Sequence, residues 1–205
     1  MAITAILWDI GGVINRTEDL KPRDELASEL GVSREYLNHL FFSSSEGTKA
    51  QLGQLSIPGL MLHIRRELKL EKDQYPDLIE RFFGGDFIDE ELVDYVRQLQ
   101  SDYKTGVISN AWSQLDDLLI SWGIKDAFDV VIGSGDVGIM KPEPEIYQLA
   151  LQRLGVQPQE AVFIDDFIEN INGAQALGIH TIHFRSKDQA VEKLKRILVK
   201  ENPPG

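Results

Sequence analysis

No cysteine occurs among the 205 residues of this sequence, and that absence removes several kinds of chemistry at once. A disulfide framework, a thiolate metal site and a cysteine nucleophile are all excluded. The fold must therefore be held together by the packing of apolar residues, which make up 42% of the chain.

Positive charge is also scarce. The chain carries 21 lysines and arginines against 33 aspartates and glutamates, which gives a formal net charge of −12 at pH 7. Proteins that bind nucleic acid or anionic lipid rely on clustered basic residues, so we expect neither a nucleic-acid partner nor a membrane partner. The same charge opposes an anionic substrate. A phosphate site here would need a local positive centre, either a metal ion or a placed lysine.

Long hydrophobic runs are missing as well. The first apolar run, from Ile3 to Trp8, is too short to span a membrane. It leads directly into Asp9 without the charged segment or the cleavage site of a signal peptide. We therefore expect a cytoplasmic protein, with both a monomer and a dimer left open.

Short apolar runs rich in valine and isoleucine alternate with segments of helical periodicity. This alternation predicts an α/β fold, in which a parallel sheet is covered by helices on both faces. The predicted strands are 3–8, 105–108, 130–132, 161–164 and 181–184. The predicted helices around them are 89–99, 113–122, 143–154, 168–177 and 187–199.

The segment from Asn15 to Gly85 follows a different pattern. Its apolar residues keep helical spacing throughout, and no run within it is typical of a strand. We predict an all-helical insert, whose phenylalanine pairs Phe41-Phe42 and Phe82-Phe83 pack in its own core. The predicted helices of the insert are 22–30, 34–42, 47–55, 58–68 and 72–83.

Carboxylates follow two of the predicted strands. Asp9 comes directly after the first strand and before Gly11 and Gly12, and Asp165 and Asp166 come directly after the fourth. Ligand sites of open α/β sheets lie at the carboxyl ends of the strands. Adjacent carboxylates repel unless they are well solvated or share a cation, and Mg²⁺ prefers such oxygen ligands. These residues predict a magnesium site, with an ordinary turn and a solvated acidic loop as the structural alternatives.

Polar side chains follow two further strands. Ser109 and Asn110 stand ahead of a predicted helix, where hydroxyl and amide groups can bind phosphate oxygens. Lys141 precedes Pro142, and the restricted backbone of the prolines would fix the direction in which this lysine points. Such a lysine could neutralise a carboxylate or a phosphate oxygen. Taken singly, the Ser-Asn pair is more typical of a helix cap, and the lysine is more typical of an exposed surface.

The order of these features along the chain favours the chemical interpretation. Four motifs occur in sequence: ILWDIGGVI, VISN, MKPEPEIY and VFIDDFIENINGAQALGI. Together they resemble the four ordered motifs of the haloacid dehalogenase-like hydrolase superfamily, subfamily I, over nearly the whole chain. The resemblance implies a Rossmann-like catalytic core of residues 1–14 and 86–205. It also implies a small helical cap, residues 15–85, inserted after the first strand.

The resemblance further implies a role for each motif residue. Asp9 resembles the nucleophile that takes the phosphoryl group of a small phosphorylated molecule, and Lys141 is similar to the lysine that steadies the nucleophile and the transferred group. The implied Mg²⁺ ligands are Asp9, the backbone carbonyl of Gly11, Asp165 and Asp166. The implied substrate contacts are Ser109, Asn110, Lys141 and Gly12.

One position departs from the pattern of the family's phosphatases. They usually carry a second aspartate two residues after the nucleophile, which acts as general acid and base, and Gly11 stands there instead. General acid–base help is typically worth roughly 10²–10⁴-fold in rate. We therefore expect a Mg²⁺-dependent phosphohydrolase for substrates with good leaving groups, such as sugar 1-phosphates, acyl phosphates or aryl phosphates, or one whose proton donor comes from elsewhere.

Two alternatives stay open. A 2-haloacid dehalogenase also lacks the second aspartate, but it resembles this chain less because those enzymes usually carry a serine-asparagine pair in place of Asp165-Asp166. A regulatory protein that binds a phosphorylated ligand with little turnover would keep the metal and phosphate residues. Only a measurement of turnover separates that protein from a phosphatase.

Overall fold

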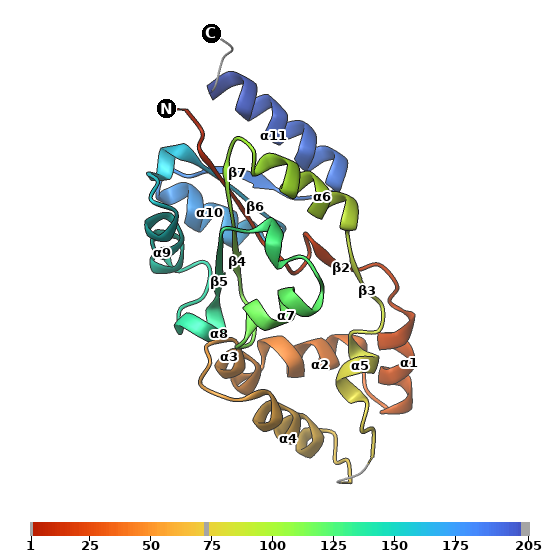
Figure 1. The fold of residues 1–205 in the computed structure, drawn as a ribbon. Coiled ribbons are helices and arrows are strands. Elements are labelled where there is room, and N and C mark those ends of the chain that lie inside the picture. The colour runs from red at the N-terminus through yellow and green to blue at the C-terminus, as the bar shows by residue number, and fades with distance from the viewer. Residues whose placement is uncertain (1, 72–73, 202–205) are drawn as a thin grey trace.

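A five-stranded parallel sheet forms the centre of the molecule in the computed structural model, which describes residues 2–71 and 74–201 (Figure 1). Its strand order is β5-β4-β1-β6-β7. Each strand lies within two residues of its predicted ends, so the predicted α/β fold is confirmed. The strands are β1 (Ala5–Trp8), β4 (Lys104–Ser109), β5 (Val130–Gly133), β6 (Ala161–Asp165) and β7 (His180–His183).

Helices cover both faces of this sheet, and every side chain of its central strand, β1, is therefore buried. Ile6 and Trp8 of β1 pack in one cluster with α6, α7 and α11, whereas Ala5 and Leu7 pack in the opposite cluster with α9 and α10. Alternate side chains of a strand point to opposite faces, which explains the division. The helices of the core are α6 (Glu90–Leu99), α7 (Leu115–Ser121), α8 (Ser134–Val137), α9 (Pro144–Leu154), α10 (Ile168–Ala176) and α11 (Lys187–Glu201).

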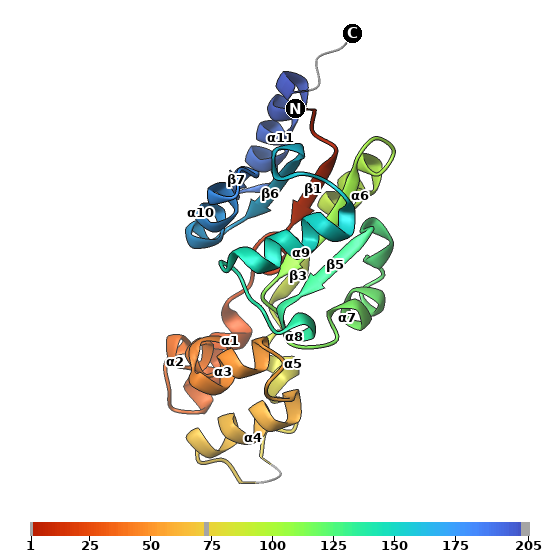
Figure 2. The same cartoon turned by 90° about the vertical axis from the view of Figure 1, so that its left-hand side faces the viewer.

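A second group of helices lies beyond the carboxyl ends of the strands and has its own apolar core (Figure 2). Phe41 and Phe82 stack at the centre of that core, with ring centroids 3.8 Å apart. Leu26, Leu37 and Leu60 are fully buried around them. The helices of this group are α1 (Lys21–Glu29), α2 (Arg34–Asn38), α3 (Ser45–Gln51), α4 (Ile57–Glu67) and α5 (Leu78–Phe82).

The prediction that no strand occurs between Asn15 and Gly85 is wrong. Strand β2 (Asn15–Thr17) pairs antiparallel with β3 (Asp86–Ile88), and the two together form the double connection between the helical group and the sheet. Both strands have only three residues, most of them polar or charged, so neither produces an apolar run. Their stability comes from pairing between residues far apart in sequence, which local periodicity does not register.

Several helix boundaries in the insert also differ from the prediction. The predicted helix 34–42 is α2 followed by a π-helical turn, His39–Ser43. The turn ends at Ser44, whose side chain accepts a hydrogen bond from the Gly47 amide and so starts α3 earlier than predicted. The predicted helix 72–83 is shorter, because residues 74–77 are not helical. Its first two residues, 72 and 73, lie outside the described residues.

Within the described ranges, we find no helix whose length and apolarity would let it cross a bilayer.

Candidate active site

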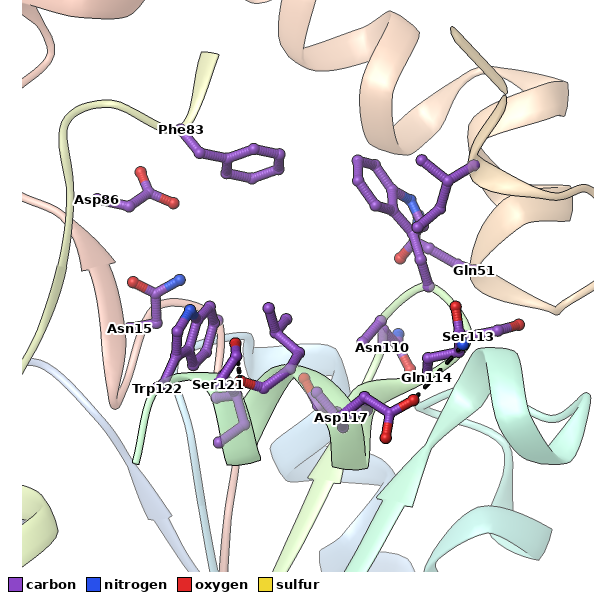
Figure 3. Close-up of a pocket in the computed structure, with 18 of the residues that line it drawn as sticks. Asn15, Gln51, Phe83, Asp86, Asn110, Ser113, Gln114, Asp117, Ser121 and Trp122 are labelled. Carbon is purple, nitrogen blue, oxygen red and sulfur yellow. Dashed lines mark hydrogen bonds between the residues drawn. The ribbon is translucent and has the colours of Figure 1, made fainter. Parts of the chain in front are cut away.

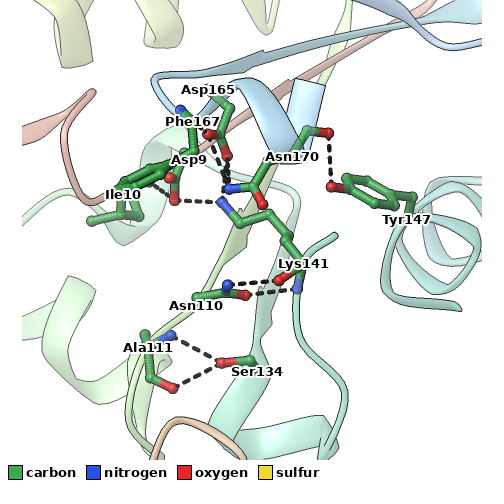
Figure 4. A network of polar contacts seen from close by, with 10 residues as sticks. All are labelled: Asp9, Ile10, Asn110, Ala111, Ser134, Lys141, Tyr147, Asp165, Phe167 and Asn170. Carbon is green, nitrogen blue, oxygen red and sulfur yellow. Dashed lines mark hydrogen bonds and ion pairs between the residues drawn. The ribbon is translucent and has the colours of Figure 1, made fainter. Parts of the chain in front are cut away.

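Three carboxylates meet at the carboxyl edge of the sheet. Figure 4 shows two of them, Asp9 and Asp165, with the side chain of Lys141 beside them. Asp9 directly follows β1, Asp165 ends β6, and Asp166 comes next. The two strands are neighbours, with Trp8 paired to Ile164, so Asp9 and Asp165 are brought side by side by the register. One oxygen from each of the three carboxylates lies within 4.8 Å of the others. The sheet therefore gathers the acidic residues that the sequence singled out.

Lys141 lies between two of these carboxylates. Its Nζ is 2.9 Å from Oδ1 of Asp9 and 2.6 Å from Oδ2 of Asp165. The lysine side chain is only 1% exposed, so it is a buried cation and not a surface lysine. One lysine faces three acidic groups, which leaves the cluster with an excess of negative charge. A divalent cation is the kind of ligand that such an excess favours.

Asp165 is fully engaged by the protein. Its carboxylate accepts hydrogen bonds from Lys141, from the Phe167 amide at 2.7 Å, and from the side-chain amide of Asn170 at 3.0 and 3.1 Å. The residue has no exposed surface. Asp165 is therefore held in place to orient the lysine, and both of its oxygens already have donors.

Asp166 presents the opposite situation. Its buried Oδ1 finds no hydrogen-bond partner among the described residues. Burial, and then the charge of Asp165, raise the pKa of Asp166 above its ordinary value. An unpaired buried carboxylate oxygen is costly, and a hard cation such as Mg²⁺ would satisfy it. The donor set of Asp166 and Asp9 thus fits a magnesium ion.

Gly12 allows Asp166 to occupy this position. A Cβ at Gly12 would lie 2.2 Å from Oδ2 of Asp166, and the residue adopts φ of +81°. Any larger residue would displace the carboxylate and strain the backbone. The sequence predicts Gly12 as a substrate contact. In the structure, the side chain next to Gly12 is that of Asp166.

The pKa of Asp9 is raised to about 7. Burial is the largest cause, and the charges of Asp165 and Asp166 add to it, while Lys141 acts in the opposite direction. The Ile10 amide also donates to Oδ1 of Asp9 at 2.7 Å and fixes its orientation. A cation beside these carboxylates would favour the ionised form, which is the form that can act as a nucleophile.

Asn110 contacts Lys141 through the backbone. Its Nδ2 donates to the Lys141 carbonyl at 3.0 Å, and its Oδ1 accepts from the Lys141 amide at 2.8 Å. Both ends of the Asn110 amide are thus occupied in holding the lysine segment. Ser109, the buried last residue of β4, lies beside it at the same edge. Sequence reasoning placed Asn110 at the site but missed this contact, because its partner is 31 residues away.

A cavity of about 700 Å³ lies between the sheet and the helical group, and its wall includes Gly11, two residues after Asp9 (Figure 3). Gly11, Ser109 and Asn110 line it on the side of the sheet, and Phe42 and Phe83 line it on the side of the helices. Both phenylalanine pairs pack in or against the core of the insert, as predicted, but one member of each pair also lines the cavity. Phe41 and Phe82 are buried in that core, whereas their neighbours Phe42 and Phe83 pack against that core and also face the cavity.

Gly11 leaves open space around its Cα atom. A Cβ built there would meet no atom within 4 Å in the described part of the chain. The residue is exposed and belongs to the cavity wall. A larger side chain at position 11 would therefore project into the cavity without a clash.

Comparison with known proteins agrees with this geometry. The model of a family described as haloacid dehalogenase-like hydrolase matches residues 3–178. Bifunctional epoxide hydrolase 2 of Sus scrofa is 26% identical over an alignment of 218 positions. The match covers 96% of this chain but 39% of that protein. This chain thus spans well under two thirds of that relative.

Two further similarities cover most of both chains. Pyrophosphatase PpaX of Bacillus cereus (strain AH820) is 26% identical over 188 residues, which cover 88% of this chain and 82% of that protein. A family enzyme from Bacteroides thetaiotaomicron, crystallised with magnesium and inorganic phosphate, is 22% identical with a TM-score of 0.77. That match covers 91% of this chain and 96% of the other, and at this identity it is evidence of a shared fold.

Proposed function

Because the chain belongs to the haloacid dehalogenase-like hydrolase family, we propose that it is a magnesium-dependent phosphohydrolase acting on a small phosphate monoester. Asp9 is its nucleophile. The observation that carries the proposal is the buried Lys141 between Asp9 and Asp165, together with the oxygen of Asp166 that has no partner among the described residues. This arrangement combines a positioned nucleophile, a lysine and a carboxylate oxygen suited to a metal ion at one edge of the sheet.

Asp9, Asp166 and the backbone carbonyl of Gly11 would hold the magnesium ion. Asp165 supports the site through Lys141 and Asn170, since its oxygens are already taken. When bound, the ion neutralises charge on the phosphate oxygens and on the facing carboxylates.

The chemistry follows from the position of Asp9. Its free carboxylate oxygen forms a bond to phosphorus while the bond from phosphorus to the ester oxygen breaks, which gives an aspartyl-phosphate and an alcohol. Lys141 stays beside Asp9 and balances charge on the transferred group. Water then attacks phosphorus, which releases inorganic phosphate and restores Asp9. The leaving oxygen must take its proton without help from a side chain at position 11. The acidity of the alcohol that is released should therefore govern the rate.

The proposal also assigns roles to the larger parts of the molecule. Residues 1–14 and 86–205 act as the catalytic core and residues 15–85 as the cap, supported by the separate apolar core of the helical group. Ser109 and Asn110 line the phosphate end of the cavity. The similarity of the chain to a pyrophosphatase supports phosphoryl transfer as the reaction. The acidic trio argues against a metal-free dehalogenase, because it would repel an anionic haloacid.

The test is phosphate release from p-nitrophenyl phosphate and a panel of phosphate monoesters, with Mg²⁺ and with EDTA. We expect turnover with Mg²⁺, loss of turnover in EDTA, and loss in Asp9→Asn with the fold unchanged. Asp102→Asn is the matched control, because Asp102 is exposed and precedes β4 at the opposite edge of the sheet. Mg²⁺ binding without any phosphate release would point to a regulatory phosphate-binding protein instead.

A further inference from the structure

The cavity beside the carboxylates indicates what the leaving group of the substrate must be like. At one end it includes Gly11, two residues after Asp9, together with Ser109 and Asn110 at the carboxyl end of the neighbouring strand β4. From there it extends away from the sheet edge toward the cap (Figure 3). A phosphoryl group at Asp9 would therefore place its ester substituent inside this space. Its volume, about 700 Å³, lies in the range of pockets that enclose drug-sized molecules.

The walls of the cavity are mainly apolar. Four half-buried aromatic side chains line it, and aliphatic side chains from both the cap and α7 fill the space between them. Apolar walls stabilise a ligand in proportion to the apolar area that they remove from water. The aromatic side chains are Phe42, Phe83, Trp112 and Trp122.

Positive charge is absent from these walls. Among the described residues that line the cavity there is no lysine, arginine or histidine, whereas Asp86 and Asp117 both belong to it. Lys141 is not among them and is already paired with two carboxylates. A second phosphate or a carboxylate on the substrate would thus face like charges without a partner, within a chain of net charge −12.

Most polar side chains in the walls already have protein partners. Gln51 donates to the Phe42 carbonyl, Asp86 accepts from Thr17 and Arg23, and both ends of the Asn110 amide hold Lys141. A sugar would lose the hydration of several hydroxyl groups and find few free donors or acceptors in return. The indole N–H of Trp112 is buried and has no partner among the described residues.

We propose that the leaving group is an uncharged, largely apolar alcohol or phenol, so that the substrate is a hydrophobic phosphate monoester rather than a sugar phosphate or a diphosphate. The inference rests on the proposed function, because that function places the phosphate at Asp9. A phenol also suits a site with glycine at position 11, since an acidic leaving group needs less help from a general acid.

The experiment measures binding of unreactive phosphonates by calorimetry in the presence of Mg²⁺. The series is ethyl-, butyl-, hexyl- and octylphosphonate, with 2-carboxyethylphosphonate as a charged ligand. We expect Kd to fall about threefold for each added methylene, and the carboxylate to bind at least tenfold more weakly than butylphosphonate. Equal affinity along the series, tighter binding of the carboxylate, or no binding at all would each overturn the inference.

Two variants on α7 locate the effect. Leu118 lines the cavity, whereas Ile120, two residues further on, is 61% exposed and is not part of the wall. Leu118→Lys should weaken octylphosphonate at least tenfold and strengthen 2-carboxyethylphosphonate, and Ile120→Lys should change neither by more than about twofold. Equal effects of the two changes would contradict the inference.

Turnover separates this inference from the proposed function. Phosphate release without any dependence of binding on chain length would leave the phosphatase intact and exclude the apolar leaving group. Chain-length dependence of binding without phosphate release would keep the ligand class and reject the phosphatase.

Discussion

Single residues at the sheet edge divide the chemistry between them. Asp165 and Asp166 are neighbours in sequence, yet the first has both oxygens engaged by donors and the second has a buried oxygen without a donor among the described residues. The same residue type can therefore serve two purposes in the proposed site: Asp165 would orient Lys141, and Asp166 would bind the cation. Asn110 adds a third purpose, because it fixes the backbone of the lysine from the neighbouring strand.

Position 11 allows a direct test of the missing acid. Gly11→Asp should fit, because the space around a Cβ there is open, and it should raise kcat/KM on alkyl phosphates by roughly 10²-fold through general acid catalysis. Hydrolysis of p-nitrophenyl phosphate should change little, since that leaving group needs no proton. Steady-state kinetics on both substrates is the measurement.

Gly11→Asn is the matched control for this change, because it has nearly the same size and cannot donate a carboxyl proton. An equal gain in both variants would mean that size or polarity, and not acidity, is what position 11 lacks. No gain in Gly11→Asp would mean that another group already delivers the proton.

The residues of the site were more accessible to sequence analysis than their contacts. Asp9 and Asp165 could be expected to meet, because each follows a strand of a parallel sheet and such strand ends share one edge. The orientation of the Asn110 amide toward the Lys141 backbone depends on how two loops pack. No local pattern encodes that packing, so the contact emerged only from the structure.

At the scale of elements, the strands that could be predicted from the sequence are the buried ones. The strands of the central sheet are buried on both faces and therefore appear as short apolar runs, such as Ala161–Asp165. Strands β2 and β3 form a ribbon that is only partly buried. They contain Asn15, Arg16 and Asp86, so their composition resembles that of a loop. The π-helical turn at His39–Ser43 likewise has an ordinary helical pattern around it.

The junction between this ribbon and α6 depends on Asp89. This buried residue caps α6 by accepting from the Leu92 amide, and it pairs with Arg16 of β2 at 2.8 Å. Burial tends to raise the pKa of Asp89, but the hydrogen bonds from Arg16 and Leu92 and the charges of Arg16 and Lys187 outweigh it. The pKa of this carboxyl is thus held below its ordinary value.

Asp89→Asn should lower the free energy of unfolding by about 2 kcal/mol at pH 7, because it keeps the cap and removes the charge. A depressed pKa stabilises the folded state above the unfolded pKa, about 3.9, and this contribution disappears as pH falls through the folded value. The difference between variant and wild type should therefore shrink below about pH 4. Urea unfolding at several pH values measures it.

Asp94→Asn on the same helix is the control, since its carboxylate is 65% exposed and pairs with Arg97 at the surface. We expect a change within about 0.5 kcal/mol. A loss in Asp89→Asn that stays constant down to pH 2 would show that packing, and not charge, is responsible.

At the scale of the whole molecule, we expect stability to depend on Mg²⁺, because three carboxylates lie close together. Saturation with Mg²⁺ at about 100 times Kd should add about 2.7 kcal/mol to the free energy of unfolding, which corresponds to roughly 5–10 °C in Tm. Asp166→Asn should lose most of this shift, because it replaces the carboxylate whose buried oxygen has no partner among the described residues. Thermal unfolding with Mg²⁺ and with EDTA measures both.

Asp188→Asn serves as the control, because Asp188 is exposed in the first turn of α11. It should keep the full response to Mg²⁺. If Asp166→Asn responds as strongly as the control does, the stabilising ion binds elsewhere on this acidic chain.

The central position of β1 also sets the order in which activity can return during refolding. Trp8 pairs with Val107 on one side and with Ile164 on the other, so the residue before Asp9 is fixed only when segments from the middle and from the end of the chain have both joined it. Lys141 reaches Asp9 across the same junction. A partly assembled sheet therefore has no competent nucleophile, and the return of turnover after dilution from denaturant marks the completion of this strand's pairing, after any earlier gain of helix.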